Sequence, residues 1–132
     1  MRSNMSVTGI GIDLIECSRI RDVLERHGDR FLERLLTPAE IEYVRGYHKQ
    51  IVPRLAGRFA AKEAILKVLG TGWRGQIAWR DIEILNDRNG QPHVTLTGEC
   101  ARIARQLGIA RVLISITHTE NYGAANAMGL RE

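Results

Sequence analysis

The chain of 132 residues is long enough for one globular domain with a modest core and too short for a second full domain. Hydrophobic residues make up 44% and charged residues 26%. No run approaches the roughly 18 apolar residues that cross a bilayer, so we expect a cytoplasmic protein without a membrane span. The net charge of +4 favours a polyanionic partner, such as nucleic acid, a phosphorylated metabolite or an acidic protein.

Cysteine spacing and the distribution of basic residues narrow these classes. Cys17 and Cys100 lie far apart and outside any CxxC pattern, so neither a disulfide framework nor a zinc site is expected. The basic residues are spread along the chain, with few aromatics and no RNP, zinc-finger or Arg-rich tract, which weighs against a nucleic-acid module. Residues 1–6 have no apolar core and are expected to be a flexible start to a single domain over residues 1–132.

The first predicted element is a strand over residues 7–13 that carries an acid at its end. Alternation places Gly9 and Gly11 on one face together with Asp13, and the isoleucines between them on the other face. Because glycine weakens a strand, the two glycines indicate that something approaches the backbone closely on the Asp13 face. Asp13 either ends the strand or presents a metal ligand.

A basic surface is expected on the first helix, which spans residues 17–28, is capped by Ser18 and stops at Gly28. The arginines on or near its exposed side are Arg19, Arg21, Arg26 and Arg30. This surface is either a solvated face or a docking site for an acidic partner. A further short helical turn is expected over residues 30–36.

A clear start signal marks the next helix, at residues 37–46. Thr37 is its N-cap, Pro38 takes the first helical position and Glu40 completes a capping box. The polar segment at residues 47–54, which contains a proline, is expected to be a connection.

The central element is a helix over residues 58–72 that ends at glycines. Most of its circumference is apolar, which predicts burial on several sides. Two charged pairs at i, i+4 spacing interrupt it, Glu63 with Lys67 and Arg58 with Lys62, on stripes that face different directions. Glu63 is either half of an intrahelical ion pair or a ligand for a hard cation, with the basic residues facing phosphate oxygens.

The rest of the chain predicts a hairpin, a third full helix and a final pair of antiparallel strands. These are strands at 82–85 and 93–96 around an Asn89-Gly90 turn, a helix at 98–107, and strands at 112–118 and 124–128. His118, at the end of a strand, is a structural hydrogen-bonding residue or a phosphate donor.

Three separated motifs together resemble one enzyme family. They are GIGIDLIE at residues 9–16, GRFAAKEA at 57–64 with Lys67 and the glycine pair of 70–72, and SITHT at 115–119. In this order and spacing they resemble the holo-acyl-carrier-protein synthases, the short class of 4′-phosphopantetheinyl transferases, from about residue 9 to residue 128. The resemblance implies an α+β fold, with an antiparallel sheet packed against a long central helix.

The activity that this resemblance implies moves the 4′-phosphopantetheine arm of coenzyme A onto a serine of apo acyl carrier protein, for fatty acid biosynthesis, and releases adenosine 3′,5′-bisphosphate. The implied metal is Mg²⁺, with Asp13 and Glu63 as its protein ligands. The resemblance implies that Lys67 is a catalytic residue together with these two acids. The base that deprotonates the serine stays open between Glu63, a metal-bound water and His118.

Partners follow from the same resemblance. The residues expected to contact the nucleotide are Arg58, Lys62, Lys67, Gly70, His118 and Thr119. The nucleotide is expected in a cleft between neighbouring subunits of a homotrimer, and the two charged stripes of the central helix suggest that one serves its own subunit and the other a shared site. The acidic carrier protein is expected to dock on Arg19, Arg26 and Arg30.

Two rival functions remain on sequence grounds. The first is a transferase that acts on the carrier domains of polyketide or peptide synthases. The second is a basic nucleic-acid module, which predicts salt-sensitive binding of DNA or RNA without metal.

Overall fold

The sheet and the helices form two layers in the computed structural model, which describes residues 6–70 and 77–131. The strands are β1 (Ser6–Glu16), β2 (Ile82–Asn86), β3 (Pro92–Leu96), β4 (Ile109–His118) and β5 (Tyr122–Arg131). The helices are α1 (Cys17–His27), α2 (Asp29–Leu35), α3 (Pro38–Arg45), α4 (Ile51–Leu69) and α5 (Gly98–Gln106), with 3-10 turns at His48–Gln50 and Trp79–Asp81. Ser6, expected to be flexible, begins β1; residues 1–5 lie outside the described ranges.

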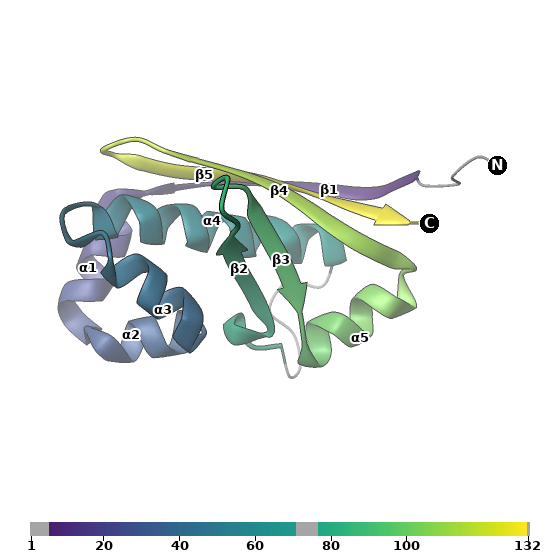
Figure 1. Ribbon diagram of the computed structural model, residues 1–132, viewed down its shortest axis with the longest axis horizontal. Coiled ribbons are helices and arrows are strands. Elements are labelled where there is room, and N and C mark those ends of the chain that lie inside the picture. Colours follow the sequence, from purple (N-terminus) through teal and green to yellow (C-terminus); the bar gives the residue numbers. More distant parts are fainter. Residues whose placement is uncertain (1–5, 71–76, 132) are drawn as a thin grey trace.

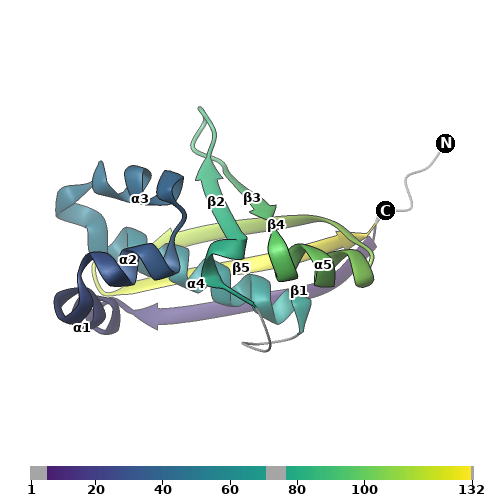
Figure 2. The same cartoon turned by 90° about the horizontal axis from the view of Figure 1, so that it is seen from below.

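The main sheet is antiparallel, with strand order β1-β5-β4, so the C-terminal strand lies in its middle. β2 and β3 form a separate hairpin. Figure 1 shows every labelled helix on one side of the main sheet, with α4 lying along it, and Figure 2 shows α4 from below, between the sheet and the smaller helices. The predicted α+β fold, with an antiparallel sheet on a long central helix, is confirmed. Within the described ranges, no helix combines the length and hydropathy that a bilayer crossing requires.

Glycines bring the sheet into backbone contact with α4. A Cβ added to Gly11 of β1 would lie 2.1 Å from the carbonyl oxygen of Ala64, and one added to Gly123 of β5 would lie 2.5 Å from the carbonyl carbon of Ala56. Any larger residue at these positions would push the helix away from the sheet. The close approach predicted from the glycine face of the first strand is therefore confirmed, and the approaching element is α4.

Helix α4 begins earlier than the sequence suggested. The segment 47–54 was expected to be a connection because it contains a proline, but the helix starts at Ile51 and Pro53 lies in its first turn. Proline is tolerated there because the first backbone N–H groups of a helix have no intrahelical partner. Helix α4 ends at Leu69, and Gly70 takes a left-handed conformation with φ of 73°. The predicted start of this helix was wrong, because the proline was taken as a sign of a connection. The predicted burial of the helix on several sides is confirmed.

A buried ion pair ties the smaller helices to α4. The Lys62 side chain is fully buried, and its Nζ donates to Glu40 Oε1 at 2.8 Å, to the Leu35 carbonyl at 2.7 Å and to the Trp79 carbonyl at 3.2 Å. The other carboxylate oxygen of Glu40 accepts from the backbone N–H of Ile84 at 3.0 Å. Burial lowers the pKa of Lys62, and the carboxylate of Glu40 opposes that shift. One pair thus joins α2, α3, the 3-10 turn at Trp79 and β2 to the central helix.

This geometry corrects the expected role of Lys62. The sequence placed its ammonium against a phosphate, together with Arg58. In the structure all three N–H groups of the ammonium have partners inside the protein, so Lys62 has no donor left for a ligand.

Of the two expected helix caps, one is confirmed and one is wrong. Thr37 and Glu40 form the predicted capping box at the start of α3. At the start of α1 the N-cap residue is Glu16, without a side-chain cap, and Ser18 lies inside the helix. Strand β1 runs directly into α1, so the helix is capped two residues before the serine.

We expect Glu40→Ala to lower the free energy of unfolding by about 3–5 kcal/mol, because it leaves the buried Lys62 charge without a partner. Chemical denaturation followed by circular dichroism measures the change. The control is Glu42→Ala, an exposed glutamate on the same helix, which should change the value by less than about 0.5 kcal/mol. A loss below about 1 kcal/mol for Glu40→Ala would contradict the role assigned to the pair.

Candidate functional site

Asp13 and Lys67 meet where β1 crosses α4. Asp13 lies on the helix side of β1, and its Oδ1 accepts a hydrogen bond from Lys67 Nζ at 3.3 Å. The same ammonium donates to the carbonyl of Ile12 at 2.7 Å. Side chains on a helix lean toward its N-terminus, so Lys67 reaches back along α4 to make these contacts.

The register between strand and helix brings Glu63 to the same place. Gly9 lies against Val68 and Gly11 against Ala64, so β1 runs antiparallel to α4. Two strand residues advance about as far as one helical turn, which puts Asp13 at the level of residue 60, with Glu63 in the turn between it and Lys67. The β5 pairing agrees, because the partner of Asp13 is Ala125, two residues beyond the glycine that contacts Ala56.

The carboxylates of Asp13 and Glu63 fit a hard divalent cation whose remaining coordination positions are taken by other ligands. Asp13 and Glu63 are both half-buried carboxylates on separate rigid elements. In the part of the chain that the structure describes, no group of three or more His, Cys, Asp and Glu side chains is placed to hold a metal. Two protein carboxylates with open positions are what Mg²⁺ uses when substrate phosphates and water complete its octahedron.

A second cluster, on another side of α4, is a pocket of about 320 Å³ lined by basic and amide side chains. It contains Arg54 and Arg58 of α4, Asn86 at the end of β2, and His118 at the end of β4. Tyr43 of α3 lines it as well. We call these five residues the cation pocket; no carboxylate lines it.

The cation pocket has hydrogen-bond donors to spare. Arg58 is 5% exposed and donates to Asn86 Oδ1 at 3.2 Å, while the buried Nε atoms of Arg58 and Arg54 have no hydrogen-bond partner among the described residues. Burial lowers the pKa of His118, and the charges of Arg54 and Arg58 lower it further. An anion bound here would satisfy the free donors and would favour the protonated imidazole.

The two clusters lie on opposite sides of one helix. Arg58 and Lys67 are nine residues apart, which is two and a half helical turns, so their side chains leave α4 in opposite directions. Lys67 reaches β1, one outer strand of the sheet, and Arg58 reaches the residues beside β2 and α3. The expectation that the charged stripes face different directions therefore holds for Arg58 and Lys67.

An apolar groove of about 430 Å³ reaches α4 one helical turn before Glu63. Phe59, one turn before Glu63, packs on Trp79 with ring centroids 5.0 Å apart, and both rings line the groove. Its other walls come from α1 and α2 and combine apolar with basic side chains. These lining residues are Val23, His27, Arg30, Phe31, Arg34 and Leu35. The predicted partner residues Arg19 and Arg26 are exposed on α1, and Arg30 is at the groove itself.

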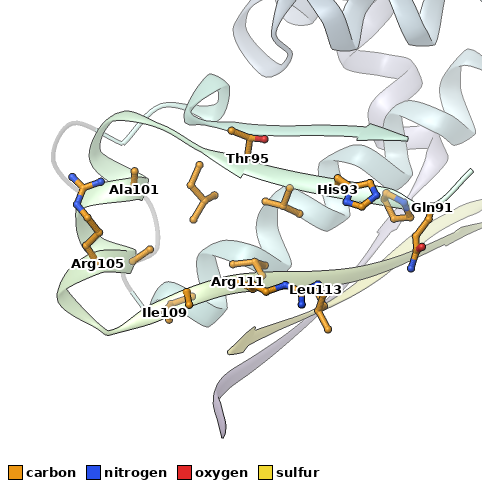
Figure 3. Close-up of a pocket in the computed structure, with 14 residues that line it drawn as sticks. Gln91, His93, Thr95, Ala101, Arg105, Ile109, Arg111 and Leu113 are labelled. Carbon is orange, nitrogen blue, oxygen red and sulfur yellow. The ribbon is translucent and has the colours of Figure 1, made fainter. Parts of the chain in front are cut away.

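A larger groove, of about 500 Å³, runs between β3, α5 and β4 and holds none of the predicted site residues (Figure 3). Gln91 and His93 lie toward one end of it and Ala101 and Arg105 toward the other. Gln91 also borders the cation pocket, so the two cavities meet at the tip of the β2–β3 hairpin. A cavity of about 670 Å³ lies instead at the predicted site, because Lys67 and the β1 residues Ile10 and Ile12 are among its lining residues.

Two residues that were predicted to contact the nucleotide, Thr119 and Gly70, stabilise the local backbone. The Thr119 hydroxyl accepts from the backbone N–H of Asn121 at 3.2 Å and of Tyr122 at 3.0 Å, which shapes the β4–β5 turn and leaves its hydrogen available. Gly70 is the left-handed cap of α4. The other two residues of the predicted glycine loop, 71 and 72, lie outside the described residues.

The sequence did not indicate that Arg54, Asn86 and Tyr43 belong to the cation pocket. Arg54 is four residues before Arg58, so an earlier helix start would have put it on the Arg58 stripe. Nothing in the local sequence pattern indicates that Tyr43 and Asn86 would contact the arginines of α4.

More than nine-tenths of the chain matches known proteins. A family model described as the 4′-phosphopantetheinyl transferase superfamily matches residues 9–124, and the chain belongs to this superfamily. The chain is 45% identical over 122 residues to the holo-[acyl-carrier-protein] synthase of Solibacter usitatus and 43% identical over 122 residues to that of Koribacter versatilis. Each match covers 92% of this chain and 97% of the relative. Within the superfamily, the chain belongs to the holo-acyl-carrier-protein synthases.

Solved structures agree on the fold. The crystal structure of the synthase from Plasmodium yoelii has a TM-score of 0.85 at 31% identity, over 98% of this chain and 99% of that one. The synthase of Bacillus anthracis, in complex with CoA (3′,5′-ADP), has a TM-score of 0.78 at 34% identity, over 96% and 98%. These matches favour the synthase family over a nucleic-acid module and over a transferase dedicated to polyketide or peptide synthases.

Proposed function

We propose that this protein transfers the 4′-phosphopantetheine group of coenzyme A to a serine of apo acyl carrier protein, with Mg²⁺ as cofactor. The observation that carries the proposal is the hydrogen bond from Lys67 to Asp13 at the crossing of β1 and α4, one helical turn from Glu63, in a chain about 45% identical to a holo-acyl-carrier-protein synthase. We also propose that the modified carrier protein serves fatty acid biosynthesis and that the protein is cytoplasmic.

The acidic cluster suits displacement at a diphosphate. The serine oxygen attacks the phosphorus attached to the pantetheine arm, the bond from that phosphorus to the bridging oxygen breaks, and adenosine 3′,5′-bisphosphate leaves. Mg²⁺ held by Asp13 and Glu63 would offset the negative charge of the diphosphate. Lys67 fixes the orientation of the Asp13 carboxylate and adds a positive charge beside the leaving group.

Glu63 is a better candidate than His118 for the base that deprotonates the serine. It lies one turn from the apolar groove, where the carrier's serine would arrive, whereas His118 belongs to the cation pocket on the other side of α4. The serine proton would therefore pass to Glu63 or to a water beside it, because His118 lies in the cation pocket and not at the groove.

Coenzyme A carries a second anionic group, the phosphomonoester on its ribose, and the cation pocket is the proposed place for it. Arg58 and Lys67 point in opposite directions, so one nucleotide meets both clusters most simply when they come from two copies of the chain.

The open face of the main sheet supports such an assembly. It exposes Ile10 by 72%, Ile12 by 71% and Leu14 by 64%, and such adjoining apolar side chains commonly mark an interaction surface. We propose that three copies pack through this face and share three sites.

The acyl carrier protein is proposed to dock on α1 and the apolar groove. Arg19 and Arg26 are seven residues apart and share one exposed face of α1, and Arg30 continues the positive surface to the groove rim. An acidic helix with an apolar side chain at its centre fits both features, since charge would steer the encounter and the groove would bury the side chain.

The transfer is tested by incubating the chain with apo acyl carrier protein, coenzyme A and Mg²⁺. We expect the carrier to gain the mass of phosphopantetheine in electrospray mass spectrometry. Asp13→Asn and Glu63→Gln should each reduce the rate by about a hundredfold or more, because each removes one of two carboxylate ligands. An unmodified carrier with the unaltered chain would refute the proposed function.

The shared site is tested by mixing inactive variants. Asp13→Asn and Arg58→Gln chains, unfolded and refolded together in equal amounts, should recover about a quarter of the unaltered rate, since a quarter of the interfaces of a cyclic trimer receive two intact halves. A mixture of Asp13→Asn and Glu63→Gln chains is the control and should recover nothing, because both defects lie on the same half. Equal recovery in the two mixtures, or none in the first, would contradict the shared site.

The docking surface is tested by charge reversal. Arg19→Glu should raise KM for the carrier protein by about tenfold, because it replaces attraction with repulsion, and leave KM for coenzyme A unchanged. Arg105→Glu makes the same charge change on exposed α5, far from α1 (Figure 1), and should leave both values within about twofold. An equal rise in KM for coenzyme A would show that Arg19 acts on the nucleotide instead.

A further inference from the structure

We infer that Tyr43 is a positioning residue that holds the guanidinium groups of Arg54 and Arg58 together, ready for one doubly charged phosphate. The inference rests on the proposed function and deepens it, because it assigns the nucleotide selectivity of the cation pocket to a residue on another helix. Tyr43 lies on α3, outside the three motifs of the family resemblance.

The contacts around Tyr43 link it to Asn86 and to both arginines. Its hydroxyl oxygen accepts from Arg54 Nη1 at 3.1 Å and from Asn86 Nδ2 at 3.1 Å. Asn86 in turn accepts from Arg58 Nη2 at 3.2 Å through its Oδ1. The Tyr43 ring lies beside the Arg58 guanidinium, with Cζ 4.6 Å from the ring centroid. One side chain therefore contacts both arginines, one through its hydroxyl and the other through its ring.

The geometry leaves donors for a ligand. The phenolic oxygen uses its acceptor capacity on Arg54 and Asn86, so its own hydrogen remains to be donated. Both arginine Nε atoms are buried without a partner among the described residues. Tyr43, Arg54 and Arg58 all line the same pocket, so the phenol and the two guanidinium groups border a single cavity.

Two neighbouring guanidinium groups repel each other, so something must keep them together before an anion arrives. Arg58 is almost fully buried and is fixed by Asn86, and Arg54 stacks over the Tyr47 ring at 3.6 Å from its centroid. The electron-rich faces of the two tyrosines offset part of the repulsion. Glu40 acts on Arg58 from a distance, but its carboxylate is already paired with Lys62. The remaining positive charge is therefore left for a phosphate.

This arrangement selects for the charge of the ligand. A phosphomonoester carries nearly two negative charges and several acceptor oxygens, and two arginines held side by side match it better than they match a neutral hydroxyl. Coenzyme A and adenosine 3′,5′-bisphosphate have such a group on the ribose, whereas AMP has a hydroxyl at the same place. The hydroxyl of Tyr43 is accordingly expected to matter only for ligands with that second phosphate.

The test is Tyr43→Phe, which keeps the ring and removes the hydroxyl. We expect KM for coenzyme A to rise about tenfold with kcat unchanged, as for a lost hydrogen bond to a charged group. Isothermal titration should show a similar loss of affinity for adenosine 3′,5′-bisphosphate and less than a twofold loss for AMP. The matched control is Tyr47→Phe, which removes a hydroxyl from the neighbouring ring and keeps the face that Arg54 packs on, and it should change each value by less than about twofold.

Each other outcome overturns the inference. Equal losses for the bisphosphate and AMP would mean that Tyr43 only supports the fold, and unchanged binding or a fall in kcat alone would remove its positioning role. If Tyr43→Phe unfolds, Asn86→Ala breaks the same link at its other end and must give the same selective loss. These results are separable from failure of the proposed function, because that failure would appear as no transfer by the unaltered chain, whereas the comparison of the two nucleotides measures binding alone.

Discussion

The backbone-to-backbone packing of α4 on the main sheet is the constraint on which the other features depend. Gly11 and Gly123 let β1 and β5 approach α4 so closely that a single Cβ would meet helix backbone. This contact fixes the register of β1 along the helix, and the register brings Asp13 to the turn that carries Glu63. Two carboxylates 50 residues apart in the chain can share a cation only if that register is kept, because a slip of one residue would turn Asp13 to the other face of the sheet.

Helix α4 also separates the two halves of the proposed site. Its Glu63 and Lys67 side serves β1, and its Arg54 and Arg58 side serves the cation pocket, so each chain has two half-sites facing apart. The same helix carries Phe59 at the groove where the carrier protein is proposed to dock. One rigid element thereby sets the positions of the proposed metal ligands, phosphate contacts and carrier contacts relative to one another, and positional precision is what phosphoryl transfer chiefly requires.

Buried polar groups hold the surrounding elements to this helix. Lys62 and Glu40 join α2, α3 and β2 around α4, while Tyr43 and Asn86 connect α3 and β2 to the arginines. An ion pair so deeply buried contributes little net stability compared with apolar packing, yet it permits few alternative arrangements because each partner would be costly to leave alone. Its value here lies in orientation, since it aligns the walls of the groove and of the cation pocket.

The sequence by itself determined the element types, the capping box at Thr37, the glycine face of β1 and the motifs that place the chain in its family, because these depend on local propensity and on short-range spacing. It also singled out Asp13, Glu63, Lys67, Arg58 and His118. Only the tertiary structure decided that Lys62 is buried with Glu40, that α4 starts before Pro53, that β5 lies between β1 and β4, and that Tyr43, Arg54 and Asn86 surround a single pocket. Those facts follow from contacts between residues far apart in the chain, and no local pattern encodes which buried polar groups will become partners.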